Sequence, residues 1–301
     1  MEHIPTVTVD QHDFLEYRRE QEQRHWSRKN SSHPLDSILT IEVNTTELCN
    51  RTCVFCPRHD PKVFPNRNLH MTKIGASQIV NNIDYDYTGK VSFSGFGENM
   101  LNPEFPDIVA EFRRLVGATL ECNTNGDKLT EDYAYELFDM GLDFLYINLY
   151  DGIEQMDHFD EIMKHIPKDK YKYRMHWSQA DHGLILNNRS GTIDWVGIDE
   201  TDISTLQGKP CHYPFYKMFV DWNGDILFCS NDWGREHVVA NLMQQSLMDA
   251  WFSKPMTKIR NRLMKGDRTQ SPCDKCSVDG SLFGQKSFDL IKEYYEDINH
   301  G

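Results

Sequence analysis

The chain has 301 residues, of which 39% are hydrophobic and 12% aromatic, and its formal net charge is −14. This composition is typical of a globular protein with one large or two modest domains, and it excludes a disordered chain. The acidic balance argues against a nucleic-acid partner, which needs a basic surface.

Residues 1–36 are polar, and we interpret them as an N-terminal extension with one helix inside the charged stretch 16–30. No apolar signal segment opens the chain, and no window is long and apolar enough to span a membrane. We therefore expect a cytoplasmic protein with no membrane partner. Eight cysteines in that compartment are more typical of metal ligands than of disulfides.

Residues 37–204 alternate strand-like and helix-like segments. The expected strands are 38–43, 89–96, 118–123 and 142–149, and the expected helices are 103–117, 130–141 and 153–166. Such alternation predicts βα units around a parallel sheet, whose active site lies at the carboxyl ends of the strands. Segments with chemically active residues follow the strands at that end: Cys49, Cys53 and Cys56, then Gly97–Glu98, Asn125–Gly126 and Asp151–Gly152.

Residues 205–301 are expected to form a small α+β domain. A β-hairpin is expected over 215–229, because Asn223-Gly224 is a strong hairpin-turn signal. One helix is expected over 246–264, and the basic run 254–268 is interpreted as a solvated helix face rather than a phosphate-binding patch. Four cysteines of this region suit either a closed [4Fe–4S] cluster or a zinc ribbon: Cys211, Cys229, Cys273 and Cys276.

The three earlier cysteines, Cys49, Cys53 and Cys56, have the spacing C-x3-C-x2-C and lack a fourth thiol close by. Three thiolates can bind three irons of a [4Fe–4S] cube and leave the fourth iron open for another ligand. A zinc site completed by a distant histidine is the alternative.

This spacing, with Phe55 just before the third cysteine, resembles the signature of the radical S-adenosylmethionine (SAM) family. The resemblance implies a partial (β/α)6 barrel over 37–204 and a [4Fe–4S] cluster whose open iron binds SAM. It also implies that a 5′-deoxyadenosyl radical abstracts hydrogen from the substrate. From Cys211 onward the chain is similar to the twitch domain, the short form of the SPASM domain, which implies a second [4Fe–4S] cluster on the four later cysteines. The resemblance covers residues 38–280.

Three further segments are similar to the family's SAM-binding segments. "GFGEN" (95–99) is similar to the Gly-Gly-Glu segment, with Phe96 and Asn99 in place of the usual Gly and Pro. The other two are "CNTNGDKLT" (122–130) and "INLYDG" (147–152). The resemblance implies that the following residues bind the cofactor: Phe55, Gly97, Glu98, Asn123, Asn125 and Asn148.

The segments 41–44, 49–53, 184–191 and 263–266 resemble twitch-domain dehydrogenases of the 2-deoxy-scyllo-inosamine type, to which aminoglycoside epimerases are related. This resemblance implies that Arg189 contacts a substrate hydroxyl; a structural turn is the alternative role. A guanidinium has donors but no acceptor, so Arg189 would orient the oxygen rather than act as a base. Water, a carboxylate, or a histidine such as His176 or His182 stays open as the proton acceptor.

The two family reactions differ in what they need. Oxidation of an alcohol needs an electron acceptor, such as a fully ligated cluster, whereas epimerisation needs a hydrogen atom from a free thiol. Only Cys122 is spare. The resemblance implies that Asn123 faces the interior, and strand alternation then predicts that Cys122 faces the helices. The orientation expected for Cys122 therefore favours oxidation of a secondary alcohol over epimerisation. The resemblance implies a small polyhydroxylated or amino-sugar-like substrate, the auxiliary cluster as electron acceptor, and flavodoxin or ferredoxin as external reductant. An epimerase, a peptide-modifying maturase and a non-catalytic zinc-binding protein are the alternatives.

Overall fold

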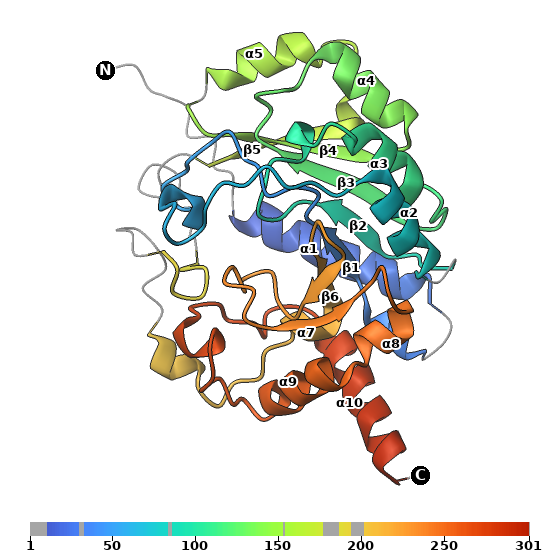
Figure 1. Ribbon diagram of the computed structural model, residues 1–301, viewed down its shortest axis with the longest axis vertical. Helices are drawn as coiled ribbons and strands as arrows, with labels where there is room; N and C mark the ends of the chain where they lie inside the picture. The colour runs from blue at the N-terminus through green and yellow to red at the C-terminus, as the bar shows by residue number, and fades with distance from the viewer. Residues whose placement is uncertain are drawn as a thin grey trace.

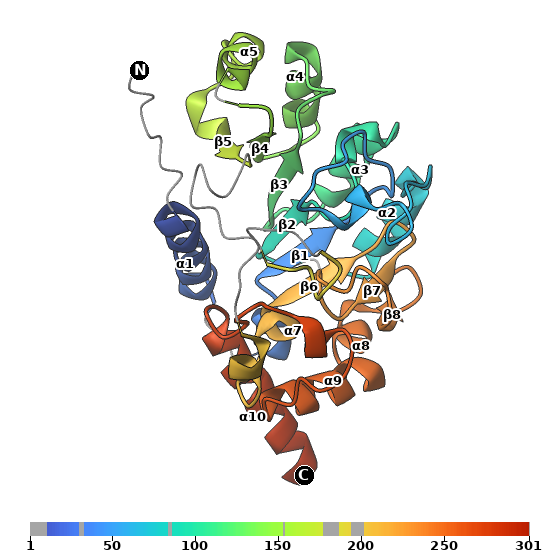
Figure 2. The same ribbon diagram turned by 90° about the vertical axis from the view of Figure 1, so that its left-hand side faces the viewer.

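The computed structural model describes residues 11–29, 33–83, 86–152, 154–176, 187–193 and 202–300. These residues build an eight-stranded sheet with the strand order β5-β4-β3-β2-β1-β6-β7-β8 (Figure 1 and Figure 2). The strands are β1 (Thr40–Val43), β2 (Lys90–Phe93), β3 (Thr119–Thr124), β4 (Phe144–Leu149), β5 (Tyr171–Met175), β6 (Lys217–Val220), β7 (Asp225–Leu227) and β8 (Val238–Asn241).

Helices flank this sheet on both sides. They are α1 (Gln11–Ser27), α2 (Lys73–Asn81), α3 (Phe105–Phe112), α4 (Glu131–Asp139), α5 (Gln155–Ile162), α7 (Tyr213–Tyr216), α8 (Leu247–Trp251), α9 (Lys254–Met264) and α10 (Gln285–His300). Short 3-10 turns are η1 (Pro34–Ser37), η2 (Pro57–His59), η3 (Asn99–Leu101), η4 (Lys168–Lys170), η5 (Ile203–Leu206) and η6 (Cys273–Lys275). None of the helices in the described part of the chain has the length and apolarity to cross a bilayer.

Strands β1 to β5 pair in parallel and in chain order, which confirms the βα alternation and the α/β class expected from the sequence. All four expected strands are present. Strand β5 was not expected, because Lys172 and Arg174 interrupt its apolar pattern. A sixth barrel strand would follow β5, where residues 177–186 lie outside the described residues.

Helices α2, α3 and α4 pack against one side of the parallel strands, and α1 lies on the opposite side (Figure 2). The three expected helices correspond to α3, α4 and α5, although residue 153 lies outside the described part. Helix α2 was missed, yet its capping signal is in the sequence, because the Thr72 hydroxyl accepts the Gly75 N–H at 3.1 Å.

The apolar core lies between the sheet and the helices α2 to α5. Phe93 on β2 makes edge-to-face contacts with Phe105 and Phe112 of α3, with 5.4 Å between each pair of ring centroids. Cys122 pairs with Phe93 in the β2–β3 register, and paired residues of neighbouring strands share a face. The fully buried Cys122 therefore faces the helices, which confirms the prediction from strand alternation.

The opposite face of the same strands is polar. Glu42, Ser92 and Glu121 form one row across β1, β2 and β3, and the Ser92 hydroxyl donates to Glu121 at 3.0 Å. Lys217 pairs with Glu42, and Lys90 pairs with Glu121 at 2.9 Å. Each buried carboxylate thus has a cationic partner that offsets its desolvation. Helix α1 reaches this face, since Gln21 accepts a bond from Lys90 at 2.7 Å.

The third region continues the same sheet. Strand β6 runs parallel beside β1, and β7 and β8 then pair antiparallel. The expected hairpin is confirmed, with its turn at Asn223-Gly224, where Gly224 has φ 81° and its N–H donates to the Asp221 carbonyl at 2.8 Å. Residues 215 and 216, expected in the first strand, belong to the short helix α7.

The prediction of one helix over 246–264 is wrong, because the segment divides into α8 and α9. Pro255 lies in the first turn of α9, and the Ser253 hydroxyl caps that helix by accepting the Met256 N–H at 3.4 Å. A proline cannot sit inside a continuous helix without removing a backbone bond, so it fixes a new start instead. Helix α10, which packs against η1 and α7, was not predicted.

The interpretation of residues 254–268 as a solvated basic face is wrong in part, because Arg260 and Arg268 are buried. Arg260 donates to the Pro214 and Trp251 carbonyls at 2.8 and 2.6 Å, and its guanidinium lies 3.9 Å from the Trp251 ring centre. The long-range carbonyl partners of these cations cannot be read from the run of charges itself.

Candidate functional site

The first three cysteines lie on the loop between β1 and α2. Asn66 brackets Cys49, since its side chain accepts the Cys49 N–H at 2.9 Å and donates to the Cys49 carbonyl at 2.9 Å. The Cys56 N–H donates to the Cys53 carbonyl at 2.9 Å, which closes a tight turn between those two. The three thiols are half-buried and stand together at the carboxyl edge of the sheet.

The thiols need a cationic partner to ionise. Burial raises the pKa of all three. For Cys53, burial and the two neighbouring thiols together raise the pKa to about 12. The buried Arg58, which donates to the Phe96 carbonyl and to Asn66, opposes the rise at Cys49 and Cys56. A set of three soft, half-buried thiols on one loop fits a [4Fe–4S] cluster with one open iron.

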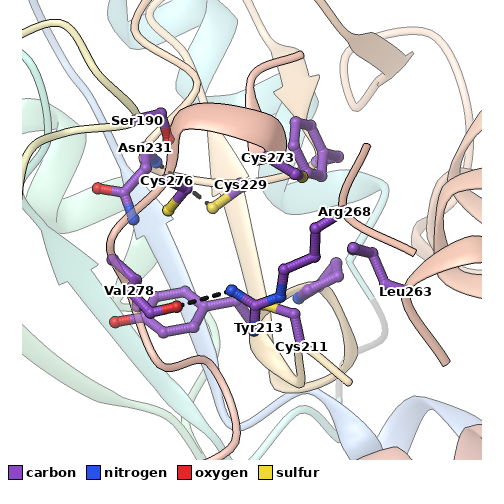
Figure 3. Close-up of a pocket in the computed structure, with 12 residues that line it drawn as sticks. Ser190, Cys211, Tyr213, Cys229, Asn231, Leu263, Arg268, Cys273, Cys276 and Val278 are labelled. Atoms are coloured by element: carbon purple, nitrogen blue, oxygen red, sulfur yellow. Dashed lines mark hydrogen bonds between the residues drawn. The ribbon is translucent and has the colours of Figure 1, made fainter. Parts of the chain in front are cut away.

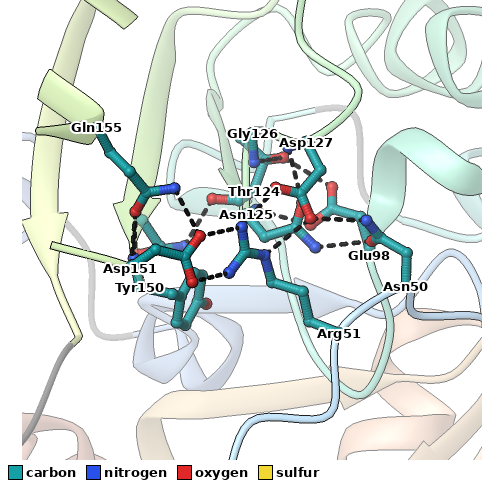
Figure 4. Close-up of polar contacts among 11 residues, drawn as sticks. Asn50, Arg51, Glu98, Thr124, Asn125, Gly126, Asp127, Tyr150, Asp151 and Gln155 are labelled. Carbon is teal, nitrogen blue, oxygen red and sulfur yellow. Dashed lines mark hydrogen bonds and ion pairs between the residues drawn. The ribbon is translucent and has the colours of Figure 1, made fainter. Parts of the chain in front are cut away.

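A polar network holds the loops after β1, β3 and β4 together (Figure 4). Arg51, inside the cysteine motif, forms a forked pair with Asp127 at 2.6 and 2.8 Å and another with Asp151 at 2.7 and 2.9 Å. Asn50 donates to Asp127 at 2.7 Å and accepts from the Asn125 amide at 2.8 Å. Sequence reasoning missed Arg51 and Asp127, whose only sequence signal is their place at strand ends.

Glu98 joins the loop after β2 to the end of β3. Its carboxylate, 4% exposed, accepts the Asn125 N–H and the Thr124 hydroxyl, both at 2.7 Å, and burial raises its pKa. The structure therefore brings Glu98 and Asn125, both expected to bind the cofactor, into contact.

Gly97 allows the close approach of two loops. A Cβ there would lie 2.1 Å from the Thr46 carbonyl oxygen, so no other residue fits without a backbone shift. Phe96, which departs from the family's usual glycine, packs with its ring against Phe64, Phe219 and Trp233. The departure thus fills a small apolar cluster beside the segment.

Phe55, Tyr150 and His176 form an aromatic group beside the first cysteine loop. The Tyr150 ring stacks on Phe55 and on His176, with centroid separations of 5.9 and 5.3 Å. The Asn148 oxygen lies 3.0 Å from Nε2 of His176, and its amide donates to the Thr124 carbonyl at 2.9 Å. Phe55 and Asn148 are therefore neighbours in the site.

His176 is a neutral imidazole in the site. Burial, together with the smaller effects of the charges of Arg174 and Arg189, lowers its pKa to about 3. Its Nδ1 is buried with no hydrogen-bond partner among the described residues. From the sequence His176 was only a neighbour of Arg189 along the chain, and His182 lies outside the described residues.

Asn123 lies on the polar interior face, apart from the loop network. Its amide donates to the Ser92 hydroxyl at 3.3 Å, and its oxygen accepts from Arg174 at 2.6 Å. This placement confirms the expected inward orientation. The ring of Tyr146 lies 3.7 Å from the Arg174 guanidinium, so the interior beside Asn123 offers both charged and aromatic surface.

The four later cysteines line one pocket in the third region (Figure 3). The pocket is lined by Cys211, Cys229, Cys273 and Cys276. Burial raises the pKa of Cys211 to about 11 and that of Cys273 to about 12, and it also raises the pKa of Cys229. Four thiols around one buried space fit a fully ligated cluster.

The described residues include no group of three or more His, Cys, Asp or Glu side chains gathered closely enough to hold one metal ion. A cubane spreads its thiolates over a wider space than a single ion does. Arg268 lines the pocket and donates to the Val278 carbonyl at 2.8 Å and to the Lys209 and Pro210 carbonyls at 3.3 Å. It thereby joins the segment before Cys211 to the segment after Cys276, and it was not foreseen from the sequence.

Arg189 lies on a tight turn between the two cysteine sites. Burial raises the pKa of Cys56 and the charge of Arg189 opposes that rise, so the guanidinium lies within electrostatic range of the first cysteine loop. The next residue, Ser190, lines the pocket of the four later cysteines. No hydrogen bond or ion pair engages the Arg189 side chain within the described part of the chain, which leaves its donors available.

Two family models match the chain. The radical SAM superfamily model matches residues 43–177, and the iron–sulfur cluster-binding SPASM domain matches residues 211–277. The first match contains the three earlier cysteines and the second contains the four later ones.

Curated relatives and solved structures agree with these matches. An S-adenosyl-L-methionine-dependent 2-deoxy-scyllo-inosamine dehydrogenase from Niallia circulans is 26% identical over 270 residues, 85% of this chain and 98% of the relative. A probable GTP 3′,8-cyclase from Methanococcus aeolicus is 29% identical over 115 residues, 37% of each protein. The crystal structure of BtrN in complex with AdoMet and 2-DOIA aligns with a TM-score of 0.69 and 24% identity, covering 82% of this chain and 96% of that chain. This structural likeness shows a shared fold.

Proposed function

Since the chain belongs to the radical SAM enzymes that carry a SPASM iron–sulfur domain, we propose that it oxidises a secondary alcohol of a small aminocyclitol or similar polyhydroxylated substrate to a ketone. The observation that carries the proposal is the placement of the eight thiols. Seven lie in the two cysteine sites, and the eighth, Cys122, is buried against the helices. A thiol in that position cannot return a hydrogen atom to a substrate radical on the other face of the sheet.

The bound groups supply the radical chemistry. Cys49, Cys53 and Cys56 would hold a cluster that, together with SAM, would supply a 5′-deoxyadenosyl radical. The four later cysteines would hold a cluster that would supply an electron acceptor. The carbinol C–H hydrogen then ends in 5′-deoxyadenosine. Loss of one electron and one proton from the remaining radical gives the ketone, so one alcohol and one SAM yield one ketone, one methionine and one 5′-deoxyadenosine.

We assign SAM binding to the residues at the carboxyl edge of the sheet. Phe55 and Asn148 contribute the aromatic and amide surface beside Tyr150 and His176. Gly97 and Glu98 shape the loop after β2, and Asn125 joins it to the loop of Arg51. Asn123 faces the interior instead, where it is suited to contact a polar substrate or the SAM ribose.

Arg189 is the proposed substrate-orienting residue. Its guanidinium donates hydrogen bonds and carries a fixed charge, so it stabilises the negative charge that develops on the substrate oxygen. The polar interior provides further donors and acceptors for hydroxyl groups, from Asn123, Arg174 and Ser92. Flavodoxin or ferredoxin is the proposed source of the electron that starts each turnover.

The test is anaerobic turnover of 2-deoxy-scyllo-inosamine and a panel of aminocyclitols and sugars, read by mass. We expect a product two mass units lighter than the substrate and one 5′-deoxyadenosine for each product. SAM cleavage without any such product across the panel would contradict the proposal. An unchanged product mass with one deuterium taken up in D2O would indicate epimerisation.

The non-catalytic zinc-binding alternative is tested separately, by colour and metal analysis. Protein purified without oxygen should be brown and contain iron and sulfide. Colourless, zinc-loaded protein that cleaves no SAM would favour the alternative.

A further inference from the structure

We infer that Asn188 is a positioning residue, which fastens the turn that carries Arg189 to the loop that carries Cys273 and Cys276. The inference rests on the proposed function for the role of Arg189, and it assigns a second task to the later cysteine site. That site holds the substrate-orienting turn in place, in addition to holding a cluster.

Asn188 makes three hydrogen bonds across 87 to 89 residues of sequence. Its backbone N–H donates to the Ser277 hydroxyl at 3.0 Å, and its side-chain oxygen accepts the Ser277 N–H at 3.1 Å. Its side-chain amide donates to the Lys275 carbonyl at 2.7 Å. Lys275 lies between the two cysteines and Ser277 directly follows Cys276, so all three bonds end on the cysteine loop itself.

The turn itself has a backbone that needs such support. Arg189 and Ser190 have φ angles of 48° and 55°, and Gly191 has 77°. Left-handed conformations at consecutive residues other than glycine cost free energy and persist where surrounding contacts fix them. A Cβ at Gly191 would lie 2.8 Å from the Lys275 Cβ, which shows how closely the turn packs on the cysteine loop. Thr192 adds one bond within the turn, from its hydroxyl to the Arg189 carbonyl at 2.7 Å.

The turn lies against the later cysteine site, since Ser190 lines the pocket of those cysteines. A displacement of the turn would therefore move the Arg189 guanidinium away from the position in which it is proposed to orient the substrate. Asn188 is the residue whose contacts tie this turn to the cysteine loop, and it touches neither a thiol of the first site nor the stacked rings near it.

Two substitutions test the fastening from its two ends. Asn188→Ala removes both side-chain bonds, and Ser277→Ala removes the acceptor of the Asn188 N–H. Asn188→Asp keeps an acceptor for the Ser277 N–H but loses the donor to the Lys275 carbonyl. The matched control is Asn82→Ala, because Asn82 also donates a side-chain bond to a distant backbone carbonyl, that of Leu242, at 2.9 Å, away from both cysteine sites.

Iron-loaded proteins are compared by hydrogen–deuterium exchange, by their visible and electron paramagnetic resonance spectra, and by turnover of 2-deoxy-scyllo-inosamine. In Asn188→Ala and Ser277→Ala we expect amide exchange of residues 187–193 to rise about tenfold, with the cluster spectra unchanged. The KM for 2-deoxy-scyllo-inosamine should rise on the order of tenfold (about 1.4 kcal/mol), while the KM for SAM stays the same. For Asn188→Asp, the amide exchange and the KM for 2-deoxy-scyllo-inosamine should lie between those of wild type and Asn188→Ala. For Asn82→Ala, both should match wild type.

Unchanged exchange over 187–193 in Asn188→Ala overturns the inference, and so does loss of a cluster spectrum in place of increased exchange. A raised KM for SAM along with that for the alcohol would show general damage and would also overturn it. If wild type leaves 2-deoxy-scyllo-inosamine unchanged, that result counts against the proposed function alone. The hydrogen–deuterium exchange measurement then tests by itself whether Asn188 holds the turn on the cysteine loop.

Discussion

Arg51 is expected to stabilise the first cysteine loop more than any exposed arginine does. Its guanidinium makes four contacts of 2.6 to 2.9 Å to two carboxylates that follow β3 and β4. We predict that Arg51→Met lowers the free energy of unfolding and speeds the loss of iron from the protein. Arg51→Lys should have a smaller effect, because an ammonium keeps the charge but not the forked geometry.

The size of this stability loss follows from how exposed the Arg51 ion pairs are to water. The side chains of Arg51 and Asp127 are 18% and 27% exposed, whereas Asp151 is 59% exposed. Water screens the Asp151 pair, which should contribute about 0.5 kcal/mol, while the forked pair with Asp127 should contribute about 1.5–2 kcal/mol. We therefore expect a loss of about 2 kcal/mol for Arg51→Met and about 1 kcal/mol for Arg51→Lys.

Urea unfolding of the reduced, metal-free protein measures this loss, and decay of visible absorbance in the iron-loaded protein measures cluster release. Arg24→Met is the matched control, because Arg24 is 69% exposed and pairs with Glu20 at 3.5 Å within one helix. That change should cost less than about 0.5 kcal/mol. Equal losses for the two methionine variants would refute the reasoning.

Three further predictions concern the thiols and His176. Cys273→Ala should leave about four of about eight irons per chain, as measured by iron analysis. The variant should still cleave SAM but form less ketone, as measured by product mass. A folded variant that oxidises the substrate at the wild-type rate would contradict the electron-acceptor role of the later cluster. Cys122→Ala should leave turnover and product mass unchanged. Its free energy of unfolding, measured in urea, should fall by about 1 kcal/mol because a buried side chain loses packing contacts. Loss of turnover would show that this thiol reaches the substrate. The pKa of His176 is about 3 when folded and about 6.5 when unfolded, so between these values the unfolded chain binds the extra proton and stability falls as pH falls. In metal-free protein, the free energy of unfolding of wild type should fall by about 1.5 kcal/mol more than that of His176→Asn between pH 6.5 and 5. An equal fall in the two proteins, measured by urea unfolding, would contradict the burial of a neutral imidazole.

The structure corrects the sequence interpretation where distant contacts override a local pattern. Residues 246–264 look like one amphipathic helix, but Pro255 and the Ser253 cap divide them. Strand β5 was missed because Lys172 and Arg174 give it the pattern of a surface segment. The partner of Arg174 is Asn123, 51 residues earlier, so its place in the interior depends on the assembled sheet.

The amino-acid sequence alone was sufficient to predict the two cysteine sets, the βα alternation and the hairpin at Asn223-Gly224, and with the family resemblance at Asn123 it also predicted the outward orientation of Cys122. Each depends on spacing or alternation within a few residues, which backbone geometry translates directly into position. Only the tertiary structure decided that Arg51 joins three loops, that Glu98 is buried beneath Asn125, and that Asn188 fastens Arg189 to the later cysteine loop. Those contacts join residues 27 to 100 positions apart, and a hydrogen bond depends on separation in space, which the order of residues does not specify.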